Sequence, residues 1–287
     1  MIEAVFTPRG QYSLRLSGHL RSDATRTVRE GLVRCMLTLD GRAEAASAWQ
    51  RTDGIVCIRA ESDAAIDRMR FVLALDDDHS EFVRRFADDP LLGEAVRTFR
   101  GLRPMRAATV VHALLRALCG QLIESRRARN LERRIISAVT AARDGLHAPP
   151  DAPTLGGLAP AELRRLGLHA RRAATLVRLC TAVDLERLRD LPTSRAAARL
   201  ERERGLGPWS VGIVCMDGLG RYERGLARDL GLVKLCSALR GRRAEAWETD
   251  ELIEPYGEWA GLASVYLLRG YARGLLPVPR SRRGVAA

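Results

Sequence analysis

The sequence predicts a mainly α-helical protein with a small α+β domain at its N-terminus. After residue 62, apolar residues recur at three- and four-residue intervals, which is the period of amphipathic helices, whereas the first 60 residues contain short strand-like runs. With 46% hydrophobic and 29% charged residues in 287, the chain has the composition of a folded globular protein with a sizeable core. We expect an α+β domain with an antiparallel sheet over residues 1–70, a helical region in two lobes over 71–276, and a disordered basic tail over 277–287.

The N-terminal segment contains patterns of both strand and helix. Residues 12–17 alternate between apolar and polar side chains, and residues 55–58 form a short apolar run, so each is expected to be a strand. Between them, residues 22–35 have helical spacing, with Ser22 or Asp23 as the cap.

The rest of the chain reads as helices separated by glycine- and proline-rich breaks. An acidic run at 76–78 precedes a helix around residues 82–86, and Pro90 opens a second helix that continues to Phe99. An apolar stripe over residues 110–122 predicts a third helix, most of whose stripe faces a core. Residues 144–160, rich in Pro, Gly and Ala, are expected to form a surface loop.

A glycine turn between two helices is the most informative motif. Residues 200–204 end a helix, residues 205–207 (Gly-Leu-Gly) turn, and residues 208–210 (Pro-Trp-Ser) open the next helix. Glycine adopts the positive φ that such a turn needs, and proline at the first helical position sacrifices no useful hydrogen bond. The motif is a helix-hairpin-helix. Its amides, at the positive end of the second helix, suit a phosphate of a nucleic acid.

One acid follows this hairpin at a distance that allows it to return. The second helix runs to about Leu219, a loop covers residues 220–228, and Asp229 opens a new apolar-periodic segment. Asp229 lies 20 residues after Trp209, enough for one helix and a returning loop, so it can approach the hairpin in space. The alternative is that Asp229 is an ordinary helix cap and the glycine turn an ordinary helix connection.

Together, these motifs resemble the helix-hairpin-helix DNA glycosylase superfamily, and in detail its AlkA-type 3-methyladenine DNA glycosylases. Residues 205–210 match the hairpin pattern of that family, and its catalytic aspartate falls on Asp229. Residues 113–122 resemble the helix and turn that carry the family's DNA-intercalating residue. Residues 168–173 resemble the segment of the family's central domain in which a helix restarts after a short turn. The resemblance covers about residues 70–275, and the first 70 residues only by position and strand pattern.

The resemblance implies a set of site residues. It implies that Asp229 is the catalytic residue and that Trp209, Ile213 and Val265 line the base pocket. It implies a DNA wedge at Gln121 and Leu122, and phosphate-binding amides at Gly205, Gly207 and Ser210. It also implies a monovalent cation bound by the main-chain carbonyls of Glu201, Glu203 and Leu206. Ile213 and Val265 stand where the type member has aromatic pocket residues, which leaves the substrate range open.

Each of these roles has a structural alternative. Leu122 can be the last core leucine of its helix, and Trp209 can pack the hairpin against the neighbouring helix. Arg126, Arg127, Arg171 and Arg172 can line the DNA groove or form a solvated helix face. Asp217, in the second helix, and Glu223, in the loop, are weaker candidates for the catalytic acid.

Charge and rare residues narrow the function further. A net charge of +12 and a pI of about 10.4 suit a polyanionic partner such as DNA. The sequence has a single lysine, Lys234, and Trp209 occupies the place of the lysine that forms a Schiff base in bifunctional relatives. The six cysteines are scattered singly, without the spacing of an iron–sulfur cluster, so we expect buried free thiols. No segment has the composition of a membrane span or a secretory signal.

The sequence therefore predicts a monofunctional DNA glycosylase of base excision repair. It would flip alkylated purines of the 3-methyladenine kind out of double-stranded DNA and hydrolyse the N-glycosyl bond. We expect a monomer that requires no cofactor and is located in the cytoplasm, associated with the nucleoid if the source is bacterial. Two alternatives stay open: a glycosylase for deaminated or oxidised bases, and a non-catalytic helix-hairpin-helix DNA-binding protein.

Overall fold

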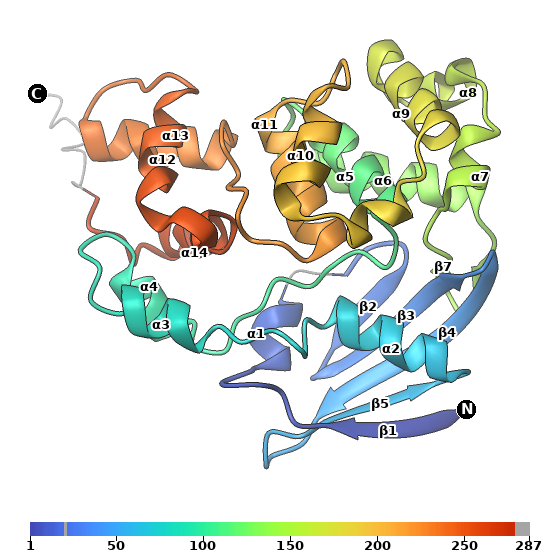
Figure 1. Ribbon diagram of the computed structural model, residues 1–287, viewed down its shortest axis with the longest axis horizontal. Coiled ribbons are helices and arrows are strands. Elements are labelled where there is room, and N and C mark those ends of the chain that lie inside the picture. Colours follow the sequence, from blue (N-terminus) through green and yellow to red (C-terminus); the bar gives the residue numbers. More distant parts are fainter. Residues whose placement is uncertain (20–21, 279–287) are drawn as a thin grey trace, which may run out of the picture. The chain divides into compact units, whose positions relative to one another are not determined.

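The computed structural model describes residues 1–19 and 22–278, which fold into two compact units (Figure 1). The first unit combines Met1–Asp78 with Gly101–Arg221, and the second combines His79–Arg100 with the segment that begins at Tyr222. The first unit thus contains the N-terminal sheet together with the glycine hairpin, and the second contains Asp229. The expected basic tail lies, from residue 279 on, outside the described residues.

An antiparallel sheet of five strands, counted within the described residues, forms one side of the first unit (Figure 1). In spatial order its strands are β1 (Ile2–Phe6), β5 (Val56–Ala60), β4 (Arg42–Gln50), β3 (Leu32–Leu39) and β2 (Arg26–Arg29). Helix α2 (Asp63–Val72), capped by the Ser62 hydroxyl, packs across one face, where Ile66 and Met69 meet the buried strand residues. The expected sheet is therefore present, and the run at residues 55–58 does belong to a strand.

Two of the N-terminal expectations are wrong. Residues 12–17 do not form a strand, because the hydroxyl of Ser13 accepts a hydrogen bond from the amide of Leu16 and caps a one-turn helix, α1 (Leu14–Gly18). Residues 22–35 do not form a helix but contribute β2 and the start of β3. Glu30 and Gly31, both at positive φ, make the tight turn that joins these strands.

The helical part of the first unit begins after an extended segment. Its elements are α5 (Val110–Gly120), α6 (Ser125–Val139), the short strands β6 (Ala142–Arg143) and β7 (Leu146–His147), α7 (Ala152–Gly156), α8 (Pro160–Arg165), α9 (Ala170–Ala182), the 3-10 helix η1 (Glu186–Asp190), α10 (Thr193–Glu201), α11 (Pro208–Ile213) and the π-helix η2 (Val214–Leu219). The apolar stripe of α5 is buried at the centre of this core, as expected. The expected loop at 144–160 is wrong in part, since β7 and α7 lie within it.

The second unit is helical. It contains α3 (Ser80–Phe86), α4 (Gly93–Thr98), α12 (Leu230–Arg240), α13 (Glu248–Ile253), the 3-10 helix η3 (Glu254–Trp259) and α14 (Ala260–Arg273). Phe82 is at its centre, with ring centroids 5.1 Å from Tyr266 and 5.8 Å from Trp259. The helix expected to open at Pro90 starts three residues later, at Gly93.

The structure also bears on the cysteines and on membrane-spanning segments. All six cysteines lie in the described residues, and each is a buried free thiol, as the sequence predicts. Among residues 1–19 and 22–278, no helix has the length and apolar character needed to cross a bilayer.

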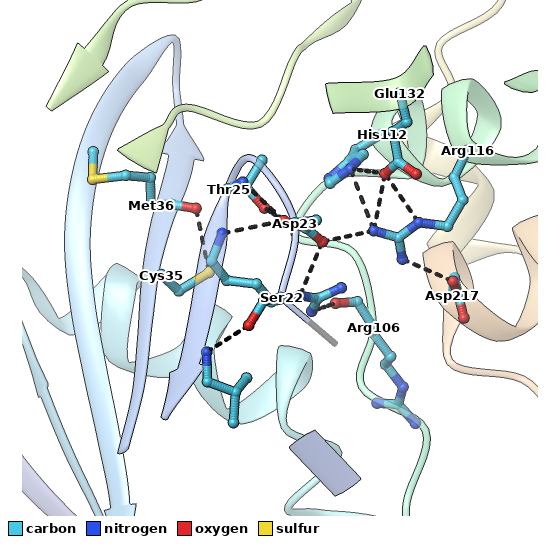
Figure 2. A network of polar contacts seen from close by, with 12 residues as sticks. Ser22, Asp23, Thr25, Cys35, Met36, Arg106, His112, Arg116, Glu132 and Asp217 are labelled. Atoms are coloured by element: carbon cyan, nitrogen blue, oxygen red, sulfur yellow. Dashed lines mark hydrogen bonds and ion pairs between the residues drawn. The ribbon is translucent and has the colours of Figure 1, made fainter. Parts of the chain in front are cut away.

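A buried network of charges joins the sheet to the helical part of the first unit (Figure 2). Arg116 of α5 is at its centre and contacts three carboxylates: Asp23 before β2, Glu132 of α6 and Asp217 of η2, at 2.9, 3.1 and 2.9 Å. His112, one turn earlier on α5, lies 2.7 Å from Glu132. One guanidinium therefore connects four segments of the chain: the stretch before β2, α5, α6 and η2.

The charges of this network shift the titration of its acids. Burial by itself raises the pKa of Asp23, but the guanidinium groups of Arg26 and Arg116 outweigh burial, and the net pKa lies well below the usual range. For Glu132, burial again opposes ionisation, and Arg116 with the His112 hydrogen bond lowers the pKa. Acids with a lowered folded-state pKa stabilise the protein above their unfolded pKa, and this stabilisation is lost as the pH falls through the folded pKa.

Replacing Arg116 is expected to destabilise the fold strongly. Arg116→Met keeps much of the side-chain volume but leaves three buried carboxylates without their shared cation, which should lower the free energy of unfolding at pH 7.5 by about 3–5 kcal/mol. The loss should shrink as the pH falls below about 5, because the stranded carboxylates then take up protons. Urea denaturation at both pH values measures the effect.

The control is Arg143→Met, which breaks the exposed ion pair with Glu61 and should cost less than about 1 kcal/mol. Equal losses in the two variants would contradict the special role of the buried network.

Candidate functional site

The glycine hairpin forms where the sequence predicts it. Helix α10 ends at Glu201, a turn follows, and α11 begins at Pro208, with Gly207 as its N-cap. Gly205 has a φ of +99°, a conformation that L side chains rarely adopt. The turn therefore depends on glycine at this position.

A neighbouring helix presses against the same turn. The hydroxyl of Thr175, on α9, donates to the carbonyl of Arg204 at 3.2 Å. A Cβ on Gly205 would lie 2.8 Å from that hydroxyl oxygen, so neither the backbone angle nor the available space admits a side chain. At Gly207 the opposite holds, because its φ is −97° and a Cβ would meet no atom within 4 Å.

The turn that ends α5 is docked onto this hairpin. The ring of Trp209 lies over Gly120, the last residue of α5, where a Cβ would be 2.5 Å from the ring carbon Cη2. One residue on, Gln121 Nε2 donates to the carbonyl of Gly205 at 2.8 Å and to the hydroxyl of Ser210 at 2.9 Å. The segment with the expected wedge and the expected phosphate-binding turn are thus in direct contact.

The two expected wedge residues point in different directions. Gln121 is turned toward the hairpin, whereas the side chain of Leu122 is 83% exposed and its backbone has a φ of +56°. Leu122 is therefore not the last core leucine of its helix. An exposed leucine held in a left-handed conformation is unusual, and strained residues of this kind are concentrated at functional sites.

The expected base-pocket residues of the first unit are half-buried. The ring of Trp209 packs on Gly120 of α5. This contact agrees with the alternative role of Trp209, in which its ring packs the hairpin against the neighbouring helix. Ile213, at the end of α11, packs against the core of this unit. Ser210 is buried, and because its hydroxyl accepts from Gln121, the part of Ser210 suited to a phosphate is its amide.

Asp229 is placed by its own helix in the second unit. Its Oδ1 accepts the amides of Gly231 at 2.7 Å and Leu232 at 3.3 Å, so Asp229 is the N-cap of α12. Gly231 lies against Leu268 of α14, the helix that also contains the buried Val265. Capping holds the carboxylate in one orientation at the start of α12.

The competing acids are differently situated. Asp217 is buried in η2 and paired with Arg116, which makes it part of the structural network. Glu223 is exposed in the loop that precedes α12. Asp229 is therefore the better candidate of the three for a role in chemistry.

Within the described residues, we consider two places whose ligand atoms suit a cation. Asp23, His112 and Glu132 have ligand atoms within 4.8 Å of one another, but Arg116 donates to both carboxylates and supplies the positive charge there. At the hairpin, the carbonyl of Glu203 accepts the amide of Leu206 at 3.1 Å and has a second lone pair available. Neutral turn carbonyls fit a weakly held monovalent cation, and the expected site on Glu201, Glu203 and Leu206 stays a prediction.

Comparisons with known proteins agree with this geometry. No protein-family model matches the chain. The DNA-3-methyladenine glycosylase of Bacillus subtilis is 27% identical over 207 residues, which cover 68% of each chain. The probable bifunctional transcriptional activator/DNA repair enzyme AlkA of Mycobacterium tuberculosis is 27% identical over 228 residues, which are 75% of this chain and 46% of that longer protein.

Solved structures decide the fold. The 3-methyladenine DNA-glycosylase from Archaeoglobus fulgidus superimposes with a TM-score of 0.80 at 20% identity, over 94% of this chain and 98% of that one. The chain has the helix-hairpin-helix DNA glycosylase fold. The 8-oxoguanine glycosylase/lyase of Clostridium acetobutylicum, bound to double-stranded DNA, shares this glycosylase fold with a TM-score of 0.75 at 16% identity, over 96% and 98% of the two chains. The chain therefore resembles the AlkA type both in its fold and in its sequence similarity to the Bacillus and Mycobacterium proteins.

Sequence reasoning missed three residues that build this site. Thr175 supports the glycine turn, Gly120 makes room for Trp209, and Arg116 ties α5 to η2. Nothing in their local sequence marks them, because each acts through a segment that is distant along the chain.

The two hairpin glycines should respond differently to alanine. Gly205→Ala forces a side chain into a positive-φ position against Thr175 and is expected to lower the free energy of unfolding by about 2 kcal/mol. Gly207→Ala should change it by less than about 0.5 kcal/mol, because its backbone is permissive and its surroundings are open. Thermal and urea denaturation compare the two, and equal destabilisation would contradict the conformational argument.

Proposed function

We propose that this protein is a monofunctional DNA glycosylase of base excision repair that releases alkylated purines of the 3-methyladenine kind. The observation that carries the proposal is the docked pair of hairpin and wedge turn, followed along the chain by one carboxylate fixed as a helix cap. The named activities of the Bacillus and Archaeoglobus proteins agree with it. The chain is accordingly assigned to the hydrolases that act on N-glycosyl bonds.

The proposed reaction begins with extrusion of the damaged base. A duplex hides the glycosidic carbon, so the nucleotide must leave the stack at a cost of about a few kcal/mol, less when the base is damaged. Leu122 has the exposed apolar side chain that can fill the gap left in the stack. The amides at Gly205, Gly207 and Ser210 hold a neighbouring phosphate at the start of α11.

Cleavage then requires stabilisation of positive charge on the sugar. As the N-glycosyl bond breaks, the electron pair leaves with the base, and the sugar becomes a cation-like transition state that a carboxylate stabilises. Asp229 supplies this carboxylate and orients the attacking water. An alkylated purine already carries positive charge, so it departs without strong general-acid assistance.

A lyase reaction has little support in this chain. It needs a deprotonatable amine near the sugar, whereas the hairpin helix has Trp209 at the relevant place and the sole lysine of the sequence, Lys234, is exposed on α12. The second candidate function is a glycosylase for oxidised or deaminated bases. The fold shared with an 8-oxoguanine glycosylase/lyase is the observation in its favour.

Double-stranded DNA with a damaged base is the proposed partner. The solved relatives with DNA in their structures support DNA binding, and the net charge of +12 agrees with it. A cytoplasmic location and a monomeric state are further parts of the proposal, as is an activity that needs no cofactor.

A duplex oligonucleotide with one alkylated purine, hypoxanthine or 8-oxoguanine discriminates these functions. Release of free alkylated base with an intact abasic strand supports the proposal. Selective release of 8-oxoguanine or hypoxanthine favours the second candidate. Strand cutting indicates a lyase, and binding without release indicates a non-catalytic DNA-binding protein.

Asp229→Asn should abolish base release and spare the fold. Asparagine is as good an N-cap as aspartate, so α12 should keep its start, while loss of the charge should lower kcat by about 100-fold or more. Single-turnover release from duplex DNA, with DNA affinity measured in parallel, tests this. Glu223→Gln is the matched control in the same unit, and a kcat for Asp229→Asn equal to that of the parent would remove Asp229 from the mechanism.

Helix α6 should bind the DNA backbone. It starts three residues after Leu122, and its exposed arginines include Arg126, Arg129 and Arg133, which form no ion pair within the described part of the chain. The one acid of α6, Glu132, is buried. If each of these arginines contacts a phosphate, replacing all three with glutamine should flatten the slope of log K against log salt by about 0.9 per contact.

The control removes the same charge from the exposed side chains of the sheet, with glutamine at Arg29, Arg34 and Arg42. Its salt slope should stay close to that of the parent. Equal slopes for the two triple variants would show that α6 contributes only net charge.

A further inference from the structure

We propose that Gln121 is a positioning residue that locks the wedge turn to the phosphate-binding hairpin. The proposal rests on the proposed function and revises the expectation that Gln121 itself enters the DNA. Its amide group is engaged by the hairpin at two points, whereas Leu122 alone projects into solvent.

The chemistry of the partners determines the orientation of the Gln121 amide. The carbonyl oxygen of Gly205 only accepts hydrogen bonds, so the atom 2.8 Å from it must be Nε2. The second hydrogen on Nε2 is directed to the hydroxyl of Ser210 at 2.9 Å. One side chain thus bridges the turn of the hairpin and the first turn of α11.

The lock acts on a residue that would otherwise relax. Leu122 has a left-handed backbone and a largely exposed apolar side chain, two states that each cost free energy in water. The contact of Gly120 with the Trp209 ring and the two hydrogen bonds of Gln121 hold the residues immediately before it. They therefore restrict the turn to the conformation in which Leu122 points outward.

A functional consequence follows from the shared anchor. The hairpin that grips a phosphate and the turn that inserts Leu122 form one rigid body through Gln121. Capture of the backbone then places the wedge against the stack without a separate ordering step, which is the advantage of preorganisation in binding. Without the lock, the same leucine would have to be ordered during insertion.

Gln121→Met is the direct test, because methionine has a similar length and no hydrogen-bond donor. The readouts are unstacking of 2-aminopurine next to an alkylated purine in a duplex, and the duplex-to-single-strand ratio of kcat/KM for release of that purine. We expect that ratio to fall by about 10-fold, the effect of losing two hydrogen bonds. Ser210→Ala, which removes one of the two bonds and keeps the amide of Ser210, should lower it by about 3-fold.

A double-mutant cycle with Leu122→Ala shows whether Gln121 acts through Leu122. If it does, adding Gln121→Met to the Leu122→Ala protein should change the ratio by less than about 2-fold. The unstacking assay is run in the Asp229→Asn background, so that it reports insertion independently of base release. Thermal denaturation checks that each variant is folded.

Two outcomes would overturn the lock. One is an unchanged ratio in Gln121→Met, and the other is a full 10-fold loss that persists when Leu122 is alanine. A parent protein that neither unstacks nor releases a base overturns the lock and the proposed function together, whereas an active parent with an unaffected Gln121→Met variant overturns the lock alone.

Discussion

The position of Arg116 is the constraint on which the first unit depends. Its guanidinium compensates three buried carboxylates from the segment before β2, from α6 and from η2. Burying any one of these acids without a partner would be costly, so the four segments are stable only when they meet at this point. Because α5 leads to the wedge turn and η2 continues the hairpin helix, the same cation sets the distance between the two halves of the proposed DNA-binding surface.

Among the residues with positive φ angles are some that lie at or next to the residues with proposed functions. Gly205 and Leu122 have positive φ angles, and both lie where the wedge turn meets the hairpin. In the second unit, Arg228, which precedes Asp229, also has a positive φ. Rigid surroundings are needed to maintain such conformations, and here Thr175 and Gln121 supply them for the first unit.

The N-cap role of Asp229 also meets a requirement of the catalytic role that we propose for it. Its cap hydrogen bonds use Oδ1 and fix the carboxylate at the start of α12, where the helix dipole favours a negative charge. A catalytic group needs such fixed geometry, since stabilisation of a sugar cation depends on a charge that does not have to reorganise. The ordinary cap interpretation and the catalytic interpretation are therefore compatible.

The sequence by itself determined the features that depend on local chemistry: the glycine turn at 205–207, the start of α11 at Pro208, the new helical segment that starts at Asp229, and the buried stripe of α5. Each follows from what a residue and its near neighbours can adopt. Only the tertiary structure decided that residues 22–35 form strands, that Gln121 faces the hairpin and that Arg116 unites four segments. These depend on partners that are distant along the chain, and no local pattern records which distant groups will meet.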